Sequence, residues 1–203
     1  MINKLRNYIR SKKAKSHAKK LYQNAKIGNN FCTSPMYSNR FLHLYHSVKI
    51  KNNSKKEEAM NIGNNCNISC AIIINQNGKI NIGNYMYMNS GCSLNISNHL
   101  TIGNNVLFGP NVKIWDSSNH PLDPKERYEQ TLKIPNQKSL NSFHIGGGNI
   151  TIGDNVWIGM DVLILGNVSI GKNAVIAARS VVTKNVEANC LYGGIPAKKI
   201  KDI

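Results

Sequence analysis

Aliphatic residues recur every six positions along most of the chain. From residue 152 onward the series is Ile152, Ile158, Ile164, Ile170, Ile176 and Val182, and a small or β-branched residue stands four positions after each member. A spacing of six rotates successive apolar residues off one face of an α-helix, so the pattern excludes an amphipathic helix. Short strands separated by tight corners produce this spacing. The sequence therefore predicts an all-β repeat protein.

Three hexads would close a triangular coil of about 18 residues, and repeats of this kind bury a core only by stacking. Stacked coils would pair their strands in parallel, about 4.8 Å apart. Glycine and asparagine are frequent at the expected corners, and both tolerate the positive φ angles that tight bends need. The expected fold is a parallel β-helix.

A second spacing locates an insertion in this coil. Ile62, Ile82 and Ile102 each open an Ile-Gly-Asn motif, and the next equivalent residue is Ile152. The third coil therefore carries about 30 extra residues, at about 116–149, and loops of this length are usually functional or disordered. The insertion contains Asp116, His120, Pro121, Asp123, Glu126, Arg127 and His144. This mixture of titratable side chains suits chemistry better than a spacer.

The first sixty residues do not follow the repeat and are strongly basic. The formal net charge of the chain is +16, and residues 1–20 are rich in Lys and Arg. This segment is expected to form a solvated basic helix, with peripheral contact to an anionic membrane as the alternative. No aromatic-interleaved or helix-turn-helix pattern accompanies the charge, so no nucleic-acid partner is expected. We expect an N-terminal segment at 1–60, a β-helical domain at 61–190 and a C-terminal cap at 191–203.

Hydropathy and cysteine spacing restrict the class of protein. No apolar run is long enough to cross a bilayer, and the start lacks the apolar core of a secretion signal. These features predict a cytoplasmic protein. The five cysteines show neither a CxxC pair nor metal-finger spacing, so neither a disulfide framework nor a metal site is expected. Cys66 and Cys92 stand where the repeat calls for small, buried residues.

Four segments, in order, resemble the hexapeptide-repeat acyltransferases. They are HPLDPKER at 120–127, ITIGDNVWIG at 150–159, VVTK at 181–184 and GGIPAKKI at 193–200. The resemblance covers about residues 62–203 and is greatest to the maltose, galactoside and surface-polysaccharide O-acetyltransferases. It implies a left-handed β-helix, an exception to the right-handed crossover rule, and a homotrimer. It also implies acetyl transfer from acetyl-CoA to a carbohydrate hydroxyl, in the synthesis of bacterial capsule or lipopolysaccharide.

The resemblance also implies a set of site residues. His120 matches the general base of the family, and Asn89 matches the asparagine that holds the acceptor sugar. Asp116 is expected beside the acceptor and the histidine. Ser97 stands where galactoside-acetylating relatives have an acidic residue, which argues against galactosides themselves as acceptors. The residues expected to bind acetyl-CoA are Trp157, Gly159, Met160, Ala178, Thr183, Lys184, Lys198 and Lys201.

The chemistry of acetyl transfer explains these residue types. A base must take the hydroxyl proton, donors must stabilise a tetrahedral oxyanion, and the substrates must be aligned. Histidine titrates near neutral pH and suits the base. A carboxylate could fix its tautomer, and the candidates are Asp116, Asp123 and Glu126. His144, at the exit of the insertion, is expected to be structural. Direct transfer needs no cysteine carrier.

Three other functions compete with this one. An amino-sugar N-acetyltransferase would use the same scaffold and mechanism, and it remains the alternative. A β-helical carbonic anhydrase would need three zinc-binding histidines, and the histidines of this chain form no repeat-spaced trio. A non-catalytic scaffold is disfavoured by the long polar insertion.

Overall fold

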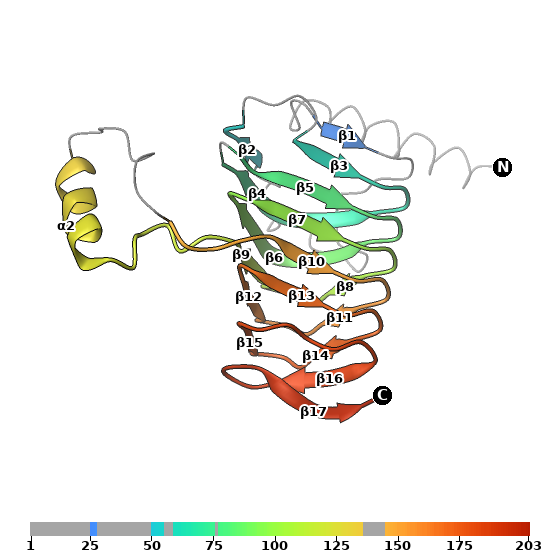
Figure 1. Cartoon of the computed structure of the whole chain (residues 1–203). Helices are drawn as coiled ribbons and strands as arrows, with labels where there is room; N and C mark the ends of the chain where they lie inside the picture. Colours follow the sequence, from blue (N-terminus) through green and yellow to red (C-terminus); the bar gives the residue numbers. More distant parts are fainter. Residues whose placement is uncertain (1–24, 28–49, 55–58, 76, 136–144) are drawn as a thin grey trace.

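The computed structural model describes residues 25–27, 50–54, 59–75, 77–135 and 145–203. These residues form a stack of short parallel strands, and the stack agrees with the predicted left-handed β-helix (Figure 1). The basic helix expected at residues 1–20 and the side chain of His144 lie outside the described residues.

One side of the coil is a parallel sheet of six described strands. Their order is β1 (Ala25–Ile27), β3 (Met60–Ile62), β5 (Lys79–Ile82), β7 (His99–Ile102), β10 (Ile150–Ile152) and β13 (Val168–Ile170). The register pairs Ile62 with Ile82, Ile82 with Ile102, and Ile102 with Ile152. The 20-residue and 50-residue spacings of the sequence therefore become one column of neighbours, and the insertion leaves this column unbroken.

The other two sides form one sheet of eleven described strands. They merge because β6 (Tyr87–Ile96) pairs with β8 (Leu107–Phe108) near its start and with β9 (Lys113–Trp115) near its end. The remaining strands of this sheet are β2 (Ile50–Asn52), β4 (Asn67–Ile74), β11 (Trp157–Ile158), β12 (Leu163–Leu165), β14 (Val175–Ile176), β15 (Val181–Val182), β16 (Cys190–Gly193) and β17 (Lys198–Asp202).

The structure shows further strands at both ends of the coil that the sequence predicted. Strands β1 and β2 pair in parallel with β3 and β4, so the described part of the stack already includes residues 25–27 and 50–52, ahead of the start expected at residue 61. At the other end, β17 pairs antiparallel with β16. The ammonium of Lys199 lies 2.8 Å from carboxylate oxygens of both Glu187 and Asp202. This hairpin lies against the last coil, where a cap was expected.

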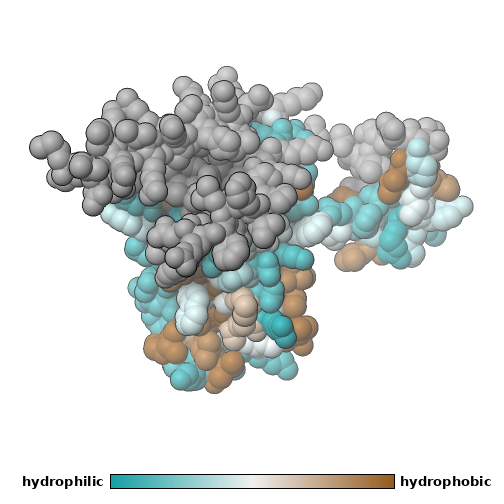
Figure 2. Space-filling view, turned by 180° about the vertical axis from the view of Figure 1, so that it is seen from behind, coloured by the Kyte–Doolittle hydropathy of each residue, from teal (hydrophilic) through white to brown (hydrophobic). Residues whose placement is uncertain are grey.

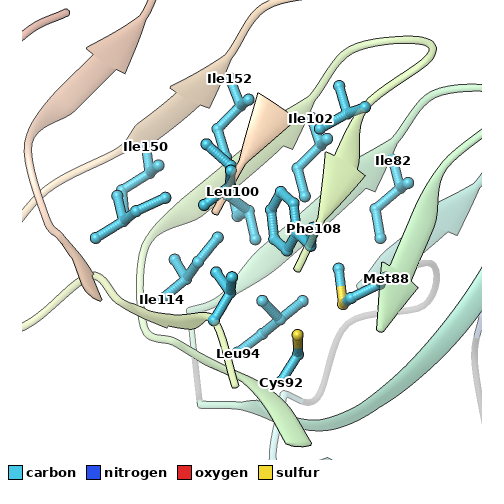
Figure 3. Close-up of a cluster of buried hydrophobic side chains, with 14 of the residues drawn as sticks. Ile82, Met88, Cys92, Leu94, Leu100, Ile102, Phe108, Ile114, Ile150 and Ile152 are labelled. Atoms are coloured by element: carbon cyan, nitrogen blue, oxygen red, sulfur yellow. The ribbon is translucent and has the colours of Figure 1, made fainter. Parts of the chain in front are cut away.

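The six-residue series fills the interior of the coil. Figure 3 shows the side chains of successive coils meeting there, with Phe108 among Ile82, Ile102 and Met88. Cys66 and Cys92 are buried in this core, which confirms their predicted position. Burial raises the pKa of the Cys92 thiol to about 12, so it behaves as an apolar residue at neutral pH.

The corners explain the abundance of asparagine. Asn65, Asn105 and Asn155 adopt positive φ values of 56–57°, a region that asparagine tolerates better than most residues. Beside them, Asn84 Oδ1 accepts a bond of 2.8 Å from the backbone amide of Asn64. Asn104 Oδ1 accepts an equivalent bond of 2.9 Å from the backbone amide of Asn84. The side chains of Asn84 and Asn104 therefore each join their own coil to the preceding one.

The glycine that follows each corner isoleucine is required by close packing between coils. A Cβ at Gly83 would lie 2.6 Å from the carbonyl oxygen of Gly103 in the next coil. We expect Gly83→Ala to lower the free energy of unfolding by about 1–3 kcal/mol, the usual cost of overpacking. Urea denaturation followed by circular dichroism measures this change.

Gly146→Ala is the matched control for that substitution. A Cβ at Gly146 would lie 3.5 Å from Ser118 Oγ, an ordinary contact. Its free energy of unfolding should stay within about 0.5 kcal/mol of the wild-type value. Equal losses in the two variants would show that the spacing of the coils does not require glycine at position 83.

The insertion leaves the coil after β9 and returns at β10. Its described residues, 116–135 and 145–149, are called the arm below. The sequence predicted a loop here, whereas the arm contains a helix, α2 (Pro124–Lys133). Figure 1 shows α2 standing away from the coil. Within the described residues, no helix has the length and apolar character that a membrane crossing requires.

Candidate functional site

Asp116 holds the base of the arm to the coil. Its side chain is fully buried, and its two carboxylate oxygens accept bonds of 2.7 Å from the backbone amides of Ser97 and Asn98. Burial raises the pKa of the Asp116 carboxyl, and these amide donors oppose part of that rise. Both oxygens serve the backbone, so the geometry fits a structural role better than contact with an acceptor sugar.

His120 lies exposed on the arm, just before α2. Its Nδ1 atom lies 2.7 Å from Oε1 of Gln130, a residue of α2 that is 2% exposed. The sequence led us to expect a carboxylate here, from Asp116, Asp123 or Glu126. The structure gives this contact to the neutral amide of Gln130 instead.

An N-terminal cap stabilises the first turn of helix α2. The side chain of Asp123 accepts bonds of 2.9 Å from the backbone amides of Lys125 and Glu126, and Pro124 opens the first turn. Asp123 is therefore engaged as a helix cap. The segment Asp-Pro-Lys-Glu was a signal in the sequence for this helix, and the helix is what carries Gln130 back to the histidine.

Five of the other predicted residues lie along one edge of the coil. Trp157 is on β11 and is 55% exposed. One column of paired residues runs through successive coils, and it consists of Met88, Phe108, Ile158 and Ile176. The residues that follow each of them in the chain therefore lie at one corner of the coil. The donor edge, as it is called below, is the set Asn89, Trp157, Gly159, Met160 and Ala178.

The backbone of the donor edge distinguishes Gly159 from Met160. The amide of Gly159 donates a bond of 2.8 Å to the carbonyl oxygen of Ile176, so the coil already uses it. Among the described residues, no acceptor pairs with the amide of Met160. Gly159 and Met160 were both expected to bind acetyl-CoA, and of their two backbone amides that of Met160 is the one left to offer a hydrogen bond.

Thr183 and Lys184 lie at a different edge. They follow Val182, which pairs with Ile164, and Ile164 pairs with Ile114 just before the arm. Both side chains are exposed and share the corner from which the arm leaves. In one chain, therefore, His120, Thr183 and Lys184 belong to the arm edge, separate from the donor edge.

Lys201 extends the face that carries Trp157. In the sheet, Trp157 pairs with Val175, Val175 with Leu191, and Leu191 with Lys201. Lys198 lies opposite Gly193 in the same hairpin. Both lysines are exposed, whereas Lys199 between them is paired with carboxylates. The exposed indole of Trp157 and the exposed ammonium groups of Lys198 and Lys201 therefore lie on the same side of the coil, with the two lysines at its C-terminal end.

Comparison with known proteins agrees with this fold. The family model for the bacterial transferase hexapeptide (six repeats) matches residues 149–184. The Saccharomyces cerevisiae protein YJL218W, which is classed with acetyltransferases, is 33% identical over 168 residues that cover 80% of this chain and 78% of that protein. The chain belongs to the hexapeptide-repeat transferase family.

One further relative and one solved structure are also similar to this chain. The galactoside O-acetyltransferase of Escherichia coli is 34% identical over 148 residues, which make up 73% of this chain and 66% of that enzyme. A point mutant of AntD, an N-acyltransferase from Bacillus cereus in complex with dTDP and coenzyme A, matches with a TM-score of 0.64 and 19% identity. This match covers 92% of this chain and 88% of that one. At that identity the likeness extends to the fold alone.

The chain matches only part of several relatives. It spans 53% of the length of one curated relative and 66% of the galactoside O-acetyltransferase.

Proposed function

We propose that this chain transfers an acetyl group from acetyl-CoA to a hydroxyl of a carbohydrate in a bacterial surface polysaccharide, with His120 as the general base. The observation that carries the proposal is the bond between His120 Nδ1 and Gln130 Oε1. This bond leaves the second ring nitrogen, Nε2, to accept a proton. Membership of a family with acetyltransferase relatives supports the acetyl group as the cargo.

The reaction would proceed by direct transfer. Nε2 of His120 takes the proton of the acceptor hydroxyl as its oxygen attacks the thioester carbonyl. The tetrahedral oxyanion accepts a hydrogen bond from the amide of Met160. Collapse of this intermediate breaks the carbon–sulfur bond, and the imidazolium returns its proton to the departing thiolate of coenzyme A.

The donor edge would hold acetyl-CoA. The exposed ring of Trp157 offers an apolar surface for the pantetheine arm, and the exposed side chain of Leu107 on the neighbouring strand extends that surface. Lys198 and Lys201 offer positive charge for the phosphates at the end of the same face. Thr183 and Lys184 would approach the coenzyme from the arm edge of a second copy.

The acceptor would bind between the arm and Asn89. Asn89 Oδ1 accepts a bond of 2.8 Å from the backbone amide of Ser90, which fixes the side chain at the corner. At position 97 the chain carries a serine whose hydroxyl accepts a bond of 2.9 Å from Asn75. A neutral hydroxyl at this position fits an acceptor other than a simple galactoside.

A homotrimer would bring the two edges together. The central outward positions of β3, β5, β7, β10 and β13 are polar, and they are Asn61, Asn81, Thr101, Thr151 and Ser169. The other two sides expose large apolar residues: Leu107 and Trp157 on one, Ile73 and Trp115 on the other. A closed ring of identical chains uses two different faces of each chain, which matches this division.

The arm supports the same assembly. It exposes Leu122, Tyr128, Leu132 and Ile134, at 82%, 66%, 55% and 45%. Figure 2 shows hydrophobic side chains both on the projecting arm and on the lower coils. A neighbouring coil would cover this apolar surface of the arm and would bring its donor edge to His120.

Acetyl transfer is the direct test of this function. Purified protein and acetyl-CoA are incubated with free sugars, nucleotide sugars and oligosaccharide acceptors, and release of the coenzyme thiol is followed. The expected result is acetylation of a hydroxyl, located by NMR. Acetylation of amino sugars alone would replace the proposal by an N-acetyltransferase, and coenzyme binding without transfer to any acceptor would contradict both.

The exposed lysines allow a prediction about the coenzyme. Replacement of Lys184, Lys198 and Lys201 by alanine should raise the KM for acetyl-CoA more than the KM for the acceptor. Each lysine should contribute about fivefold or less, because exposed ion pairs are screened by solvent. Initial rates at varied acetyl-CoA measure the change. As a control, Lys172→Ala removes an exposed charge at the corner after β13, which carries neither the arm edge nor the donor edge, and should leave this KM unchanged.

A further inference from the structure

Helix α2 buries a polar residue and exposes its apolar ones. Gln130 is its buried residue, at 2% exposure, whereas Tyr128 and Leu132 are 66% and 55% exposed. A helix usually buries its apolar face. Burying an amide is favourable only when its hydrogen bonds are satisfied. The contacts of Gln130 therefore account for its place in the arm.

The orientation of the Gln130 amide follows from its second partner. The side-chain nitrogen, Nε2, donates a bond of 3.2 Å to the carbonyl oxygen of Asn119. A carbonyl oxygen only accepts hydrogen bonds, so it must face the NH₂ group and not the amide oxygen. The amide oxygen then faces His120 Nδ1 at 2.7 Å. The ring must donate in that bond, which places the proton of the neutral ring on Nδ1.

The surrounding loop is held by further bonds that leave the ring itself to Gln130. Ser118 Oγ donates a bond of 2.8 Å to the carbonyl oxygen of His120. The guanidinium of Arg127 donates to the carbonyl oxygens of Pro121, at 3.1 Å, and Leu122, at 2.9 Å. These contacts fix the backbone around the histidine. They do not select its tautomer.

We infer that Gln130 is a positioning residue that holds His120 in the Nδ1–H tautomer and so keeps Nε2 ready to accept a proton. This inference rests on the proposed function for its catalytic consequence, but the tautomer itself does not depend on any activity. A neutral amide differs from a carboxylate in this role, because it orients the ring without adding a negative charge that would favour imidazolium.

Gln130→Met tests this role, since methionine keeps the length of the side chain and removes both hydrogen bonds. Without Gln130 the neutral ring is free to adopt the Nε2–H tautomer, in which Nε2 cannot act as a base. The expected loss of kcat is on the order of 10- to 100-fold, as for other residues that orient a functional histidine. The KM for acetyl-CoA and the midpoint of thermal unfolding should not change.

Glu129→Met is the matched control, because it makes the same substitution at the adjacent, exposed position of α2. It should leave kcat unchanged. A wild-type kcat in Gln130→Met would overturn the positioning role. A fall in kcat with an equal rise in KM or a lower unfolding midpoint would also overturn it, because both outcomes indicate a purely structural role.

NMR of ¹⁵N-histidine-labelled protein separates this inference from the proposed function. The ring-nitrogen shifts of His120, assigned by comparison with His120→Ala, should report protonated Nδ1 in wild type at high pH. In Gln130→Met they should report increased protonation of Nε2. Observation of Nε2–H in the wild type would overturn the inference whether or not the protein transfers acetyl groups. Failure of acetyl transfer with the expected tautomer present would overturn only the proposed function.

Discussion

His120→Ala is expected to lower kcat by about 10²–10⁴-fold, the usual contribution of a positioned general base. The fold and the affinity for acetyl-CoA should remain, because the arm that carries His120 stands away from the stacked core (Figure 1). In the wild type, kcat/KM should rise with pH through one ionisation as the imidazole loses its proton. Initial rates, coenzyme titration and circular dichroism on one sample measure all three quantities.

His99→Ala is the control for that substitution. His99 is an exposed histidine on β7, and the proposed mechanism gives it no role. Its one printed contact with the arm is a backbone bond of 3.2 Å from its amide to Asn149 Oδ1, which the substitution leaves in place. Its removal should leave kcat and the pH profile unchanged. Near-wild-type turnover in His120→Ala would remove this residue from the mechanism, and His144 would then be the next residue to test.

Mixing two inactive variants should restore activity if the site lies between chains. His120→Ala removes the base from the arm, and Ala178→Arg places a large charged side chain on the donor edge. In trimers assembled at random from equal amounts of both, about one quarter of the sites combine an intact arm with an intact donor edge, because a closed ring repeats one kind of interface. Co-refolded mixtures should therefore recover about one quarter of wild-type activity.

The same two proteins mixed after folding, and assayed before chains exchange, serve as the control. They should show only the residual rates of the parent variants. If the co-refolded mixture is equally inactive, the site is completed within one chain. Light scattering on the wild-type protein should in parallel give the mass of three chains, and a fully active monomer would also contradict the composite site.

The spacing of apolar residues was sufficient to predict the coil. A six-residue period fits short strands and corners and does not fit a helix, so the sequence predicts a shared interior for Ile152, Ile158 and Ile164, and all three side chains are buried there. The distance from Ile102 to Ile152 likewise located the insertion. The six-residue period and the spacing of equivalent residues repeat from coil to coil. Because each coil packs against a similar neighbour, the same pattern predicts the position of each residue in the stack.

The sequence of the arm predicted neither its helix nor the hydrogen-bond partner of His120. Asp123 and Pro124 form a start signal for its helix, whereas the break in the six-residue period predicted only a loop. Asp116, Asp123 and Glu126 were compared as partners of His120 because carboxylates commonly orient histidines. Two of these carboxylates are instead bonded to backbone amides, and the ring contact comes from Gln130, ten positions along the chain.

The repeat, its corners, the buried series and the place where the coil is interrupted follow from the periodicity of side chains along the chain, so the amino-acid sequence was sufficient to predict them. Contacts between residues distant in sequence depend on the three-dimensional fold. The partner of His120 depends on how α2 folds back, and the burial of Asp116 depends on two amides from the preceding coil. The separation of the arm edge from the donor edge depends on the three sides of a closed coil. Such contacts join residues whose spacing carries no period, so they have no signature along the chain.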